Sequence, residues 1–212
     1  MIEIKNVTKK FGDFTAIENI TFNVDKSSIY GLVGYNGAGK TTLLKTCAGI
    51  YSSDGGAVLI DGENVYDNGK IRESIFFIPD ELYFPRGATL NKMKDFYKGY
   101  YEDFSEKVFN KMADAMGLDT NKSLQSFSKG MQRQAEIVLA MATRPKYMLL
   151  DEVFDGIDPQ KRELCKKIFI EYMAETECSI LMSSHNLQEV ADLCDHVALL
   201  NGKGLELNVS VD

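Results

Sequence analysis

One short segment limits the possible folds of this chain more than any other: the run Gly34-Tyr-Asn-Gly-Ala-Gly-Lys-Thr41. It matches G-x-x-x-x-G-K-[ST], in which glycines let the backbone curl so that consecutive N–H groups point at phosphate oxygens. The apolar segment Ile29 to Val33 precedes it, and a helical stripe from Leu43 to Ala48 follows it. Strand, loop and helix in this order predict a phosphate-binding loop at the positive end of a helix.

A pair of carboxylates, Asp151 and Glu152, closes a second apolar segment, Tyr147 to Leu150. Two acidic groups beside a buried strand cost energy unless a cation or protons engage them. We therefore expect Asp151 to support a Mg²⁺ shell together with the Thr41 hydroxyl, and Glu152 to accept a proton from an attacking water. The structural alternative is an acidic pair that only caps the next helix.

A histidine, His185, follows a third apolar segment, Ile180 to Ser184. Ligands of doubly wound sheets bind beyond the carboxyl ends of the strands, so Gly34, Asp151 and His185 should converge on one crevice. His185 is then predicted to contact the outermost phosphate, where Lys40 also supplies charge. Without the phosphate loop, a lone histidine would be a surface or core residue, and His196 receives no role on that ground.

Composition narrows the classes of protein. The chain has 212 residues, is 44% hydrophobic and carries a formal charge of -7, which favours a packed core and disfavours binding to nucleic acid. Its longest apolar run, Ile137 to Ala142, is far shorter than the roughly 18 residues of a spanning helix, and the opening Met1 to Lys5 is not a secretory signal. We expect a cytosolic protein whose four scattered cysteines are reduced and packed.

The hydrophobic pattern predicts an α/β fold with a mixed sheet. Alternation in residues 1–24, broken at Gly12-Asp13, predicts an N-terminal antiparallel β layer. Strands are expected near 29–33, 57–60, 75–78, 147–150, 180–182 and 197–200, with helices near 159–174 and 187–194. Between Thr89 and Thr143 the spacing is helical, so an inserted α-helical subdomain is predicted, with the stripe that includes Met93, Phe96, Tyr97, Val108, Met112 and Met116 as core packing.

The domain organisation follows from this pattern. A single domain over 1–212 is expected, with a catalytic core of about 1–80 and 144–212 and a helical subdomain of about 81–143. The absence of an internal repeat disfavours a tandem pair of such units. The chain stops soon after the strand near 197–200, which leaves no room for an accessory regulatory domain.

The segment Phe127-Ser-Lys-Gly-Met-Gln-Arg133 discriminates between families that share a phosphate loop. It stands just ahead of the carboxylate pair and resembles the signature motif of the ATP-binding-cassette (ABC) ATPases, and the resemblance covers essentially the whole chain. An ordinary serine N-cap at Ser128 would explain the same residues, and both interpretations can hold. The resemblance implies a P-loop NTPase core and a dimer in which the signature contacts ATP on the opposite subunit through Ser128, Lys129, Gly130 and Met131.

The same resemblance implies roles elsewhere. ATP and Mg²⁺ are the implied ligands, and the implied nucleotide contacts are Gly34, Tyr35, Asn36, Gly37, Ala38, Gly39, Lys40, Thr41 and Thr42. Phe11, followed by Gly12, stands where the family stacks an aromatic on adenine, with packing between two strands as the equal alternative. Asp155 to Pro159 resembles the D-loop, in which Asp158 communicates across the dimer, although a turn followed by a proline at the first helical position would look the same.

Two features depart from the common family pattern. Many members carry glutamine after the third apolar strand, whereas this sequence has Asp80, which we expect to replace only part of its contact with Mg²⁺ and water. Lys129 and Met131 replace the common glycine and glutamine, which resembles the branch with exporter-type permeases.

These observations lead to a functional hypothesis. The chain is expected to hydrolyse ATP as a homodimer, or as a heterodimer with a related subunit, and to drive an integral-membrane permease while bound peripherally to the cytoplasmic face of the cell membrane. Two alternatives remain: a soluble ABC-type ATPase acting on ribosomes or chromosomes, disfavoured by the acidity of the chain, and a low-turnover nucleotide-binding regulator, suggested by Asp80. The transported substrate and its direction are not readable from the sequence.

Overall fold

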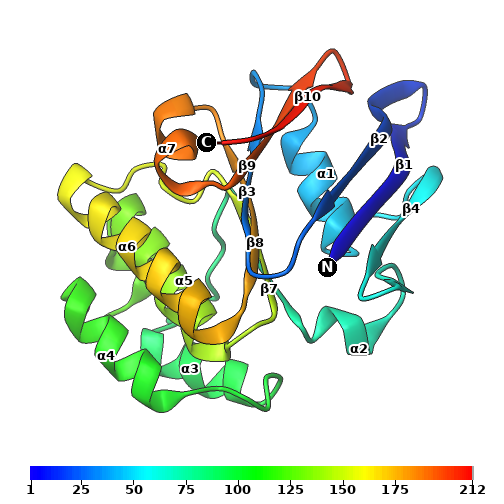
Figure 1. Ribbon diagram of the computed structural model, residues 1–212. Helices are drawn as coiled ribbons and strands as arrows, with labels where there is room; N and C mark the ends of the chain where they lie inside the picture. The colour runs from blue at the N-terminus through cyan, green and yellow to red at the C-terminus, as the bar shows by residue number, and fades with distance from the viewer. Residues whose placement is uncertain (212) are drawn as a thin grey trace.

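Two sheets organise the chain in the computed structural model, which describes residues 1–211 (Figure 1). The first is a four-stranded antiparallel sheet with the order β2-β1-β4-β5. Alternate side chains of its strands are buried, which is the pattern of a sheet with one face on the core. The strands are β1 (Ile2–Phe11), β2 (Phe14–Val24), β4 (Gly55–Ile60) and β5 (Glu63–Asn64).

The second sheet has six strands in the order β10-β9-β3-β8-β7-β6 and is parallel except for the pair of β9 and β10. Its three central strands are buried along their whole length, as expected where helices cover both faces. The strands are β3 (Ile29–Val33), β6 (Ile75–Ile78), β7 (Tyr147–Asp151), β8 (Ser179–Ser184), β9 (His196–Asn201) and β10 (Gly204–Ser210).

Helix α1 (Lys40–Cys47) lies between the two sheets, where Leu43, Leu44 and Cys47 complete a core shared by both (Figure 1). Helices α5 (Lys129–Thr143), α6 (Pro159–Thr176) and α7 (Leu187–Leu193) contribute to the core on the other face of the six-stranded sheet. This stacking of a helix layer on each face of the parallel strands fixes the ends of those strands at one edge of the molecule.

Between β6 and β7 the chain is helical. Thr89, Ser105 and Ser128 each cap a helix by accepting a backbone N–H bond through the side-chain oxygen. The segment contains α3 (Leu90–Lys98), α4 (Glu106–Met116), the 3₁₀ turn η1 (Leu124–Ser126) and α5, and a short helix α2 (Gly69–Arg72) precedes β6. Within residues 1–211, no helix is both long and apolar enough to cross a membrane.

The predicted fold class is confirmed: a P-loop NTPase type of mixed sheet, an antiparallel N-terminal layer and inserted helices. One expectation was wrong. Phe96, predicted to pack in the core, is 54% exposed because it lies on the outward face of α3, whereas Met93, Met112 and Met116 are buried. All four cysteines are buried and unbridged, as expected. The short elements β5 and α2 and the edge strand β10 were not predicted.

Candidate functional site

The strand order brings four predicted site segments together at one edge of the six-stranded sheet. β3, β8, β7 and β6 are consecutive neighbours. Gly34 follows β3, His185 follows β8, Asp151 ends β7, and Asp80 stands two residues beyond β6. The predicted convergence therefore has a structural basis in the parallel pairing of these strands.

The phosphate loop wraps the N-terminus of α1. Gly39 has φ +99°, and a Cβ there would lie 2.4 Å from a methyl of Ile17 and 2.9 Å from the Ala16 carbonyl oxygen, so glycine is required. The Lys40 ammonium is buried and donates to the Gly34 carbonyl oxygen at 2.7 Å. The same ammonium lies 3.5 Å from a carboxylate oxygen of Glu152. The loop thus holds the Lys40 ammonium beside the carboxylate of Glu152.

A cavity of about 300 Å³ opens over this loop. Its wall combines the loop with Glu152, Asp80 and the start of β2, so Lys40, Thr41, Asp80 and Glu152 share one space, whereas Asp151 and His185 lie outside the lining. The lining residues are Phe14, Ala16, Asn36, Gly37, Gly39, Lys40, Thr41, Thr42, Asp80 and Glu152.

Other residues predicted to contact nucleotide lie outside this lining. Ala38 is buried in the core, and the exposed Tyr35 accepts the Gly202 N–H at its hydroxyl oxygen, 3.2 Å away. Phe11 is 45% exposed and packs edge-on against Tyr51, with ring centroids 5.3 Å apart. The interior of the cavity therefore offers Phe14 as its aromatic, which the sequence analysis did not single out.

Asp151 has the environment of a cation ligand. It is fully buried, and its Oδ1 accepts a hydrogen bond from the Ser183 hydroxyl at 2.6 Å, whereas its Oδ2 has no hydrogen-bond partner within residues 1–211. Burial raises the pKa of Asp151, a shift that the Ser183 and Thr41 hydroxyls oppose and the charges of Asp80 and Glu152 reinforce. An orphaned buried oxygen among like charges fits a small divalent cation such as Mg²⁺.

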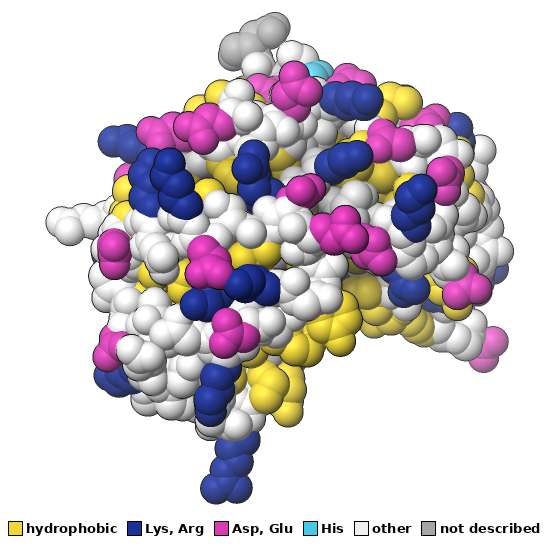
Figure 2. Space-filling model, turned by 90° about the horizontal axis from the view of Figure 1, so that it is seen from below, with side chains coloured by type: hydrophobic (Ala, Val, Ile, Leu, Met, Phe, Trp, Pro, Cys, Tyr) yellow, Lys and Arg dark blue, Asp and Glu magenta, His cyan; other side chains and the backbone are white. Residues whose placement is uncertain are grey.

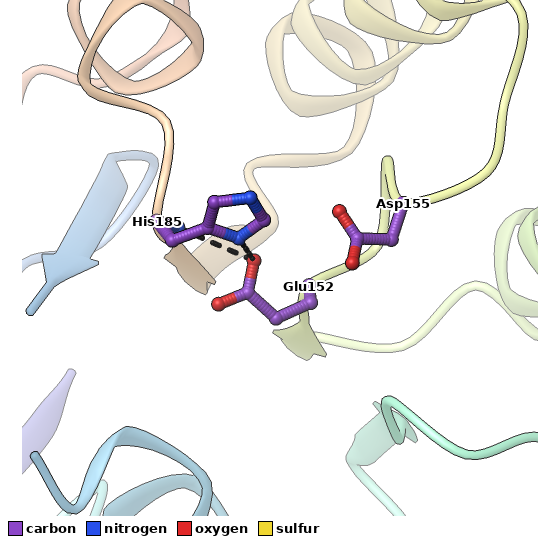
Figure 3. Close-up of side chains that lie close together, drawn as sticks. All are labelled: Glu152, Asp155 and His185. Carbon is purple, nitrogen blue, oxygen red and sulfur yellow. Dashed lines mark hydrogen bonds and ion pairs between the residues drawn. The ribbon is translucent and has the colours of Figure 1, made fainter. Parts of the chain in front are cut away.

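Glu152 and His185 are held against each other beyond the strand ends (Figure 3). Oε2 of Glu152 lies 2.9 Å from Nδ1 of His185, and this hydrogen bond, followed by the charge of Glu152, raises the histidine pKa. The Glu152 backbone has φ +48°, a conformation costly for a residue with a side chain, and its N–H donates to the Ser183 hydroxyl oxygen at 3.0 Å. That backbone turn aims the carboxylate at the cavity. Asp155 lies beside the pair, with ligand atoms of all three residues within 4.8 Å.

The signature segment, Phe127 to Arg133, lies outside the cavity that contains Lys40. Ser128 is exposed and caps α5 by accepting the Met131 N–H at 3.2 Å, which agrees with the helix-capping interpretation. A Cβ on Gly130 would lie 2.3 Å from the Gly156 carbonyl oxygen, so this glycine lets α5 approach the D-loop. Asp158 likewise caps α6 by accepting the Lys161 N–H at 3.0 Å. Neither the signature nor Asp158 contributes to the lining of the Lys40 cavity.

Sequence reasoning missed two residues that orient the site. Ser183 bridges Asp151 and the Glu152 backbone from the neighbouring strand, and Arg133 reaches from α5 to Asp80. Arg133, Ile137 and Met141 recur every four residues, and all are fully buried. That spacing places Arg133 on the core-facing side of α5, which was a usable signal for a buried functional arginine.

Comparison with known proteins agrees with this geometry. The sequence profile of the family described as ABC transporter matches residues 17–155. The ABC transporter ATP-binding protein YtrB of Bacillus subtilis (strain 168) is 29% identical over 212 residues, covering 100% of this chain and 73% of that protein. The linearmycin resistance ATP-binding protein LnrL of the same organism is 26% identical, covering 100% and 70%.

Structural comparison gives the same assignment. A solved ATP-binding subunit of an ABC transporter superposes with a TM-score of 0.90 at 26% identity, covering 100% of this chain and 90% of that chain. The chain belongs to the ABC transporter family. Within that family it is an ATP-binding protein that hydrolyses ATP.

Proposed function

We propose that this chain powers a membrane transporter through ATP-dependent pairing with a second subunit, coupled to a separate integral-membrane permease. The observation that carries the proposal is that the phosphate loop borders the nucleotide cavity, whereas the signature segment of the same chain does not. The cavity over the phosphate loop gathers Lys40, Thr41 and Glu152, whereas Ser128 faces solvent away from that cavity. A signature helix start free of its own nucleotide site is suited to the site of a twin.

Each catalytic residue has a role that its position supports. Glu152 acts as the general base, since its carboxylate borders the cavity where the attacking water would stand. Lys40 binds the outer phosphates, and His185 holds the Glu152 carboxylate and meets the terminal phosphate. Magnesium, held by Thr41, Asp151 and Asp80, would neutralise phosphate charge as the terminal phosphoryl group is transferred to water.

The signature segment, Asp158 and Phe11 would complete the interface between the two subunits. Ser128, Lys129, Gly130 and Met131 would meet the nucleotide of the partner subunit, homologous or identical, and Asp158 would lie across the same interface. Phe11 would stack on adenine, because its ring is half-exposed at the β1–β2 turn.

An aromatic groove on another face is the candidate contact for the permease. A cavity of about 660 Å³ lies between α2 and α3 and includes exposed rings of Phe96 and Tyr100. Figure 2, which views the molecule from below, shows hydrophobic side chains gathered at a hollow of that face, among charged groups of both signs. A mostly apolar groove with exposed aromatics suits a helical segment of a partner. Its lining residues are Gly69, Arg72, Glu73, Phe96, Tyr97, Tyr100 and Tyr101.

The helical segment 81–143 would then act as a moving unit against the core formed by 1–80 and 144–212. This segment includes α3, which forms one wall of the groove, and the start of α5 at Ser128. A displacement of α3 by the permease would therefore also move the start of α5. Peripheral attachment to the cytoplasmic face of the cell membrane follows from a permease partner, and nucleic acid is not an expected ligand. The relative LnrL is named for resistance to linearmycin, which supports the exporter-type branch indicated by Lys129 and Met131.

One further candidate, a low-turnover nucleotide-binding regulator, rests on Asp80, whose carboxylate is bonded to Arg133 rather than free. A tagged chain purified from detergent-solubilised membranes distinguishes the two. We expect a protein with several membrane spans to co-purify and to raise the ATPase rate. A chain that hydrolyses ATP well but never recovers such a partner would contradict transport, and a chain with negligible turnover even with its partner would favour the regulator.

A further inference from the structure

Arg133 is the largest fully buried side chain of the described residues, and it does not serve the core as an apolar residue would. Its guanidinium donates to the carbonyl oxygens of Pro79 and Asp80 and to Oδ1 of Asp80, the last at 2.9 Å. One planar fork therefore fixes both the backbone and the carboxylate of the loop that follows β6. A lysine, with a single point of charge, could not hold these three acceptors in one plane.

The acidic groups around Arg133 offset part of the cost of burying its charge. Burial lowers its pKa, but the charges of Asp80, Asp155 and Asp151 oppose that shift. One turn further along α5 the buried Glu136 faces it, and the Arg133 charge lowers the raised pKa of that carboxyl. A buried cation is tolerated when it is paired and hydrogen-bonded in this way. The guanidinium thus stands among four carboxyl groups rather than in an apolar pocket.

Asp80, the residue held by this fork, borders the nucleotide cavity. It lines the same space as Lys40, Thr41 and Glu152, and its charge contributes to the raised pKa of Asp151. Its Oδ1 is engaged by Arg133, and the side chain is 47% exposed. Asp80 thus borders the cavity from a loop whose backbone and carboxylate are both held by Arg133.

We propose that Arg133 is a positioning residue that aims Asp80 at the divalent cation of the bound nucleotide. This inference rests on the proposed function, because it takes Asp80 and Asp151 as the carboxylates around that cation. Arg133 lies five positions beyond Ser128 on the same helix, α5. Movement of α5, when its start engages a twin, is therefore transmitted to the cation site through one side chain.

The test measures metal affinity separately from hydrolysis. The ADP complex of the purified chain is titrated with Mn²⁺, and free Mn²⁺ is followed by electron paramagnetic resonance. Replacing a residue that orients a metal ligand costs about 10–100-fold in metal affinity, so Arg133→Lys is expected to weaken Mn²⁺ binding about tenfold or more. Asp80→Asn changes the proposed ligand itself and is expected to weaken Mn²⁺ binding at least as much. Affinity for fluorescent ADP in excess EDTA should stay within about twofold of the parent, since the phosphate loop is untouched.

A double variant shows whether the two residues act as one unit. Arg133→Lys with Asp80→Asn should bind Mn²⁺ no more weakly than Asp80→Asn alone. The matched control is Lys166→Gln, which removes another buried cation, bonded to Asp192 at 2.9 Å on the far helices, and should leave Mn²⁺ binding unchanged. Thermal melting of each variant reports whether it is folded.

The possible results distinguish a failure of the Arg133 inference from a failure of the proposed function. A parent complex that binds no Mn²⁺ would overturn the proposed metal site and this inference together. A parent that binds Mn²⁺, with folded Arg133→Lys unchanged or with losses that add in the double variant, would overturn this inference alone. If Arg133→Lys does not fold, Asp80→Asn decides, because it keeps the bonds of Arg133 to the backbone; unchanged Mn²⁺ affinity there also overturns the inference.

Discussion

The phosphate loop and the signature start are both helix N-termini, yet they are built in different ways. At α1 the ammonium of Lys40 is buried and already engaged by carbonyl and carboxylate oxygens of its own chain. At α5 the Ser128 side chain is exposed, and its hydroxyl oxygen accepts a hydrogen bond from the Met131 N–H of its own helix. The first is prepared to receive a ligand within the chain; the second presents its donors outward.

The comparison extends to what surrounds each helix start. Near Lys40, one buried oxygen of Asp151 has no hydrogen-bond partner in the part of the chain that the structure describes, and Glu152 has a left-handed backbone. At the start of α5, Gly130 packs closely against the backbone of Gly156. The buried carboxylate of Asp151 and the strained backbone of Glu152 therefore both lie in the loop half of the site, where the chemistry is proposed to occur.

The largest effect should come from the loop half. Glu152→Gln removes the proposed base while keeping the size of the side chain, so ATP hydrolysis is expected to fall about 10²–10⁴-fold with ATP binding retained. Steady-state phosphate release and nucleotide affinity measure the two quantities. Glu163→Gln, an exposed change on α6, is the control. Unchanged turnover in Glu152→Gln would remove Glu152 from the role of base.

The signature half should respond in the opposite way. Ser128→Arg places a bulky cation at the exposed helix start, so ATP-dependent dimerisation is expected to be lost, with hydrolysis reduced at least about tenfold. Nucleotide affinity of the isolated chain should be unchanged, because the Lys40 cavity does not include Ser128. Sedimentation with and without ATP measures the pairing. Gln125→Arg adds the same charge three positions earlier and should still pair; equal pairing of both variants would contradict the signature assignment.

A third prediction concerns the helix that bears Ser128 rather than the loop. Burial raises the pKa of Glu136 from 4.5 to about 7, so its contribution to the free energy of unfolding is complete below pH 4.5 and is lost as the pH rises through 7. Glu136→Gln is neutral at every pH. Relative to the parent it should gain up to about 3 kcal/mol of stability between pH 4.5 and 8, measured by urea unfolding. A pH-independent difference would show that Glu136 titrates normally.

The smallest expected effect lies at His185. Its pKa is raised by the hydrogen bond to Glu152, so the stabilisation is fully present below pH 6.5 and is lost as the pH rises through the raised value. Because the ring is 55% exposed, solvent screening keeps this below about 1 kcal/mol. Comparison of parent and His185→Gln unfolding at pH 6 and 9 measures it, and a difference that grows toward pH 9 would contradict the assignment.

Much of the loop half could be predicted from the sequence because local patterns determine it. A short apolar strand followed by glycines, or by two carboxylates, places Lys40, Asp151 and Glu152 at strand ends. Parallel pairing of the strands then brings these ends to the same edge of the sheet. What could not be predicted depends on which strands and helices are neighbours. Ser183 meets Asp151 only because β8 pairs with β7, and Arg133 meets Asp80 only because α5 packs beside β6.

The errors in the fold have similar causes. Phe96 belongs to a helical stripe, but the stripe is wider than the face that α3 buries, so its ring stays exposed. The strand β10 pairs at the sheet edge with few buried side chains, and its alternation of Leu205, Leu207 and Val209 after the Gly202 turn was a signal that could have been used. Edge elements leave weak hydrophobic patterns because little of their surface is buried.

Mixing two variants, each defective in a different half of the site, tests the shared site most directly. Lys40→Met removes the loop cation and Ser128→Arg blocks the signature, so each chain alone should have negligible ATPase activity. In a head-to-tail pair of the two, one composite site contains Lys40 of one chain and Ser128 of the other, both intact. Hydrolysis should recover on mixing, to at most about a quarter of the parent rate for random pairing. Failure to recover at any ratio, with both variants folded, would contradict a site shared between two chains.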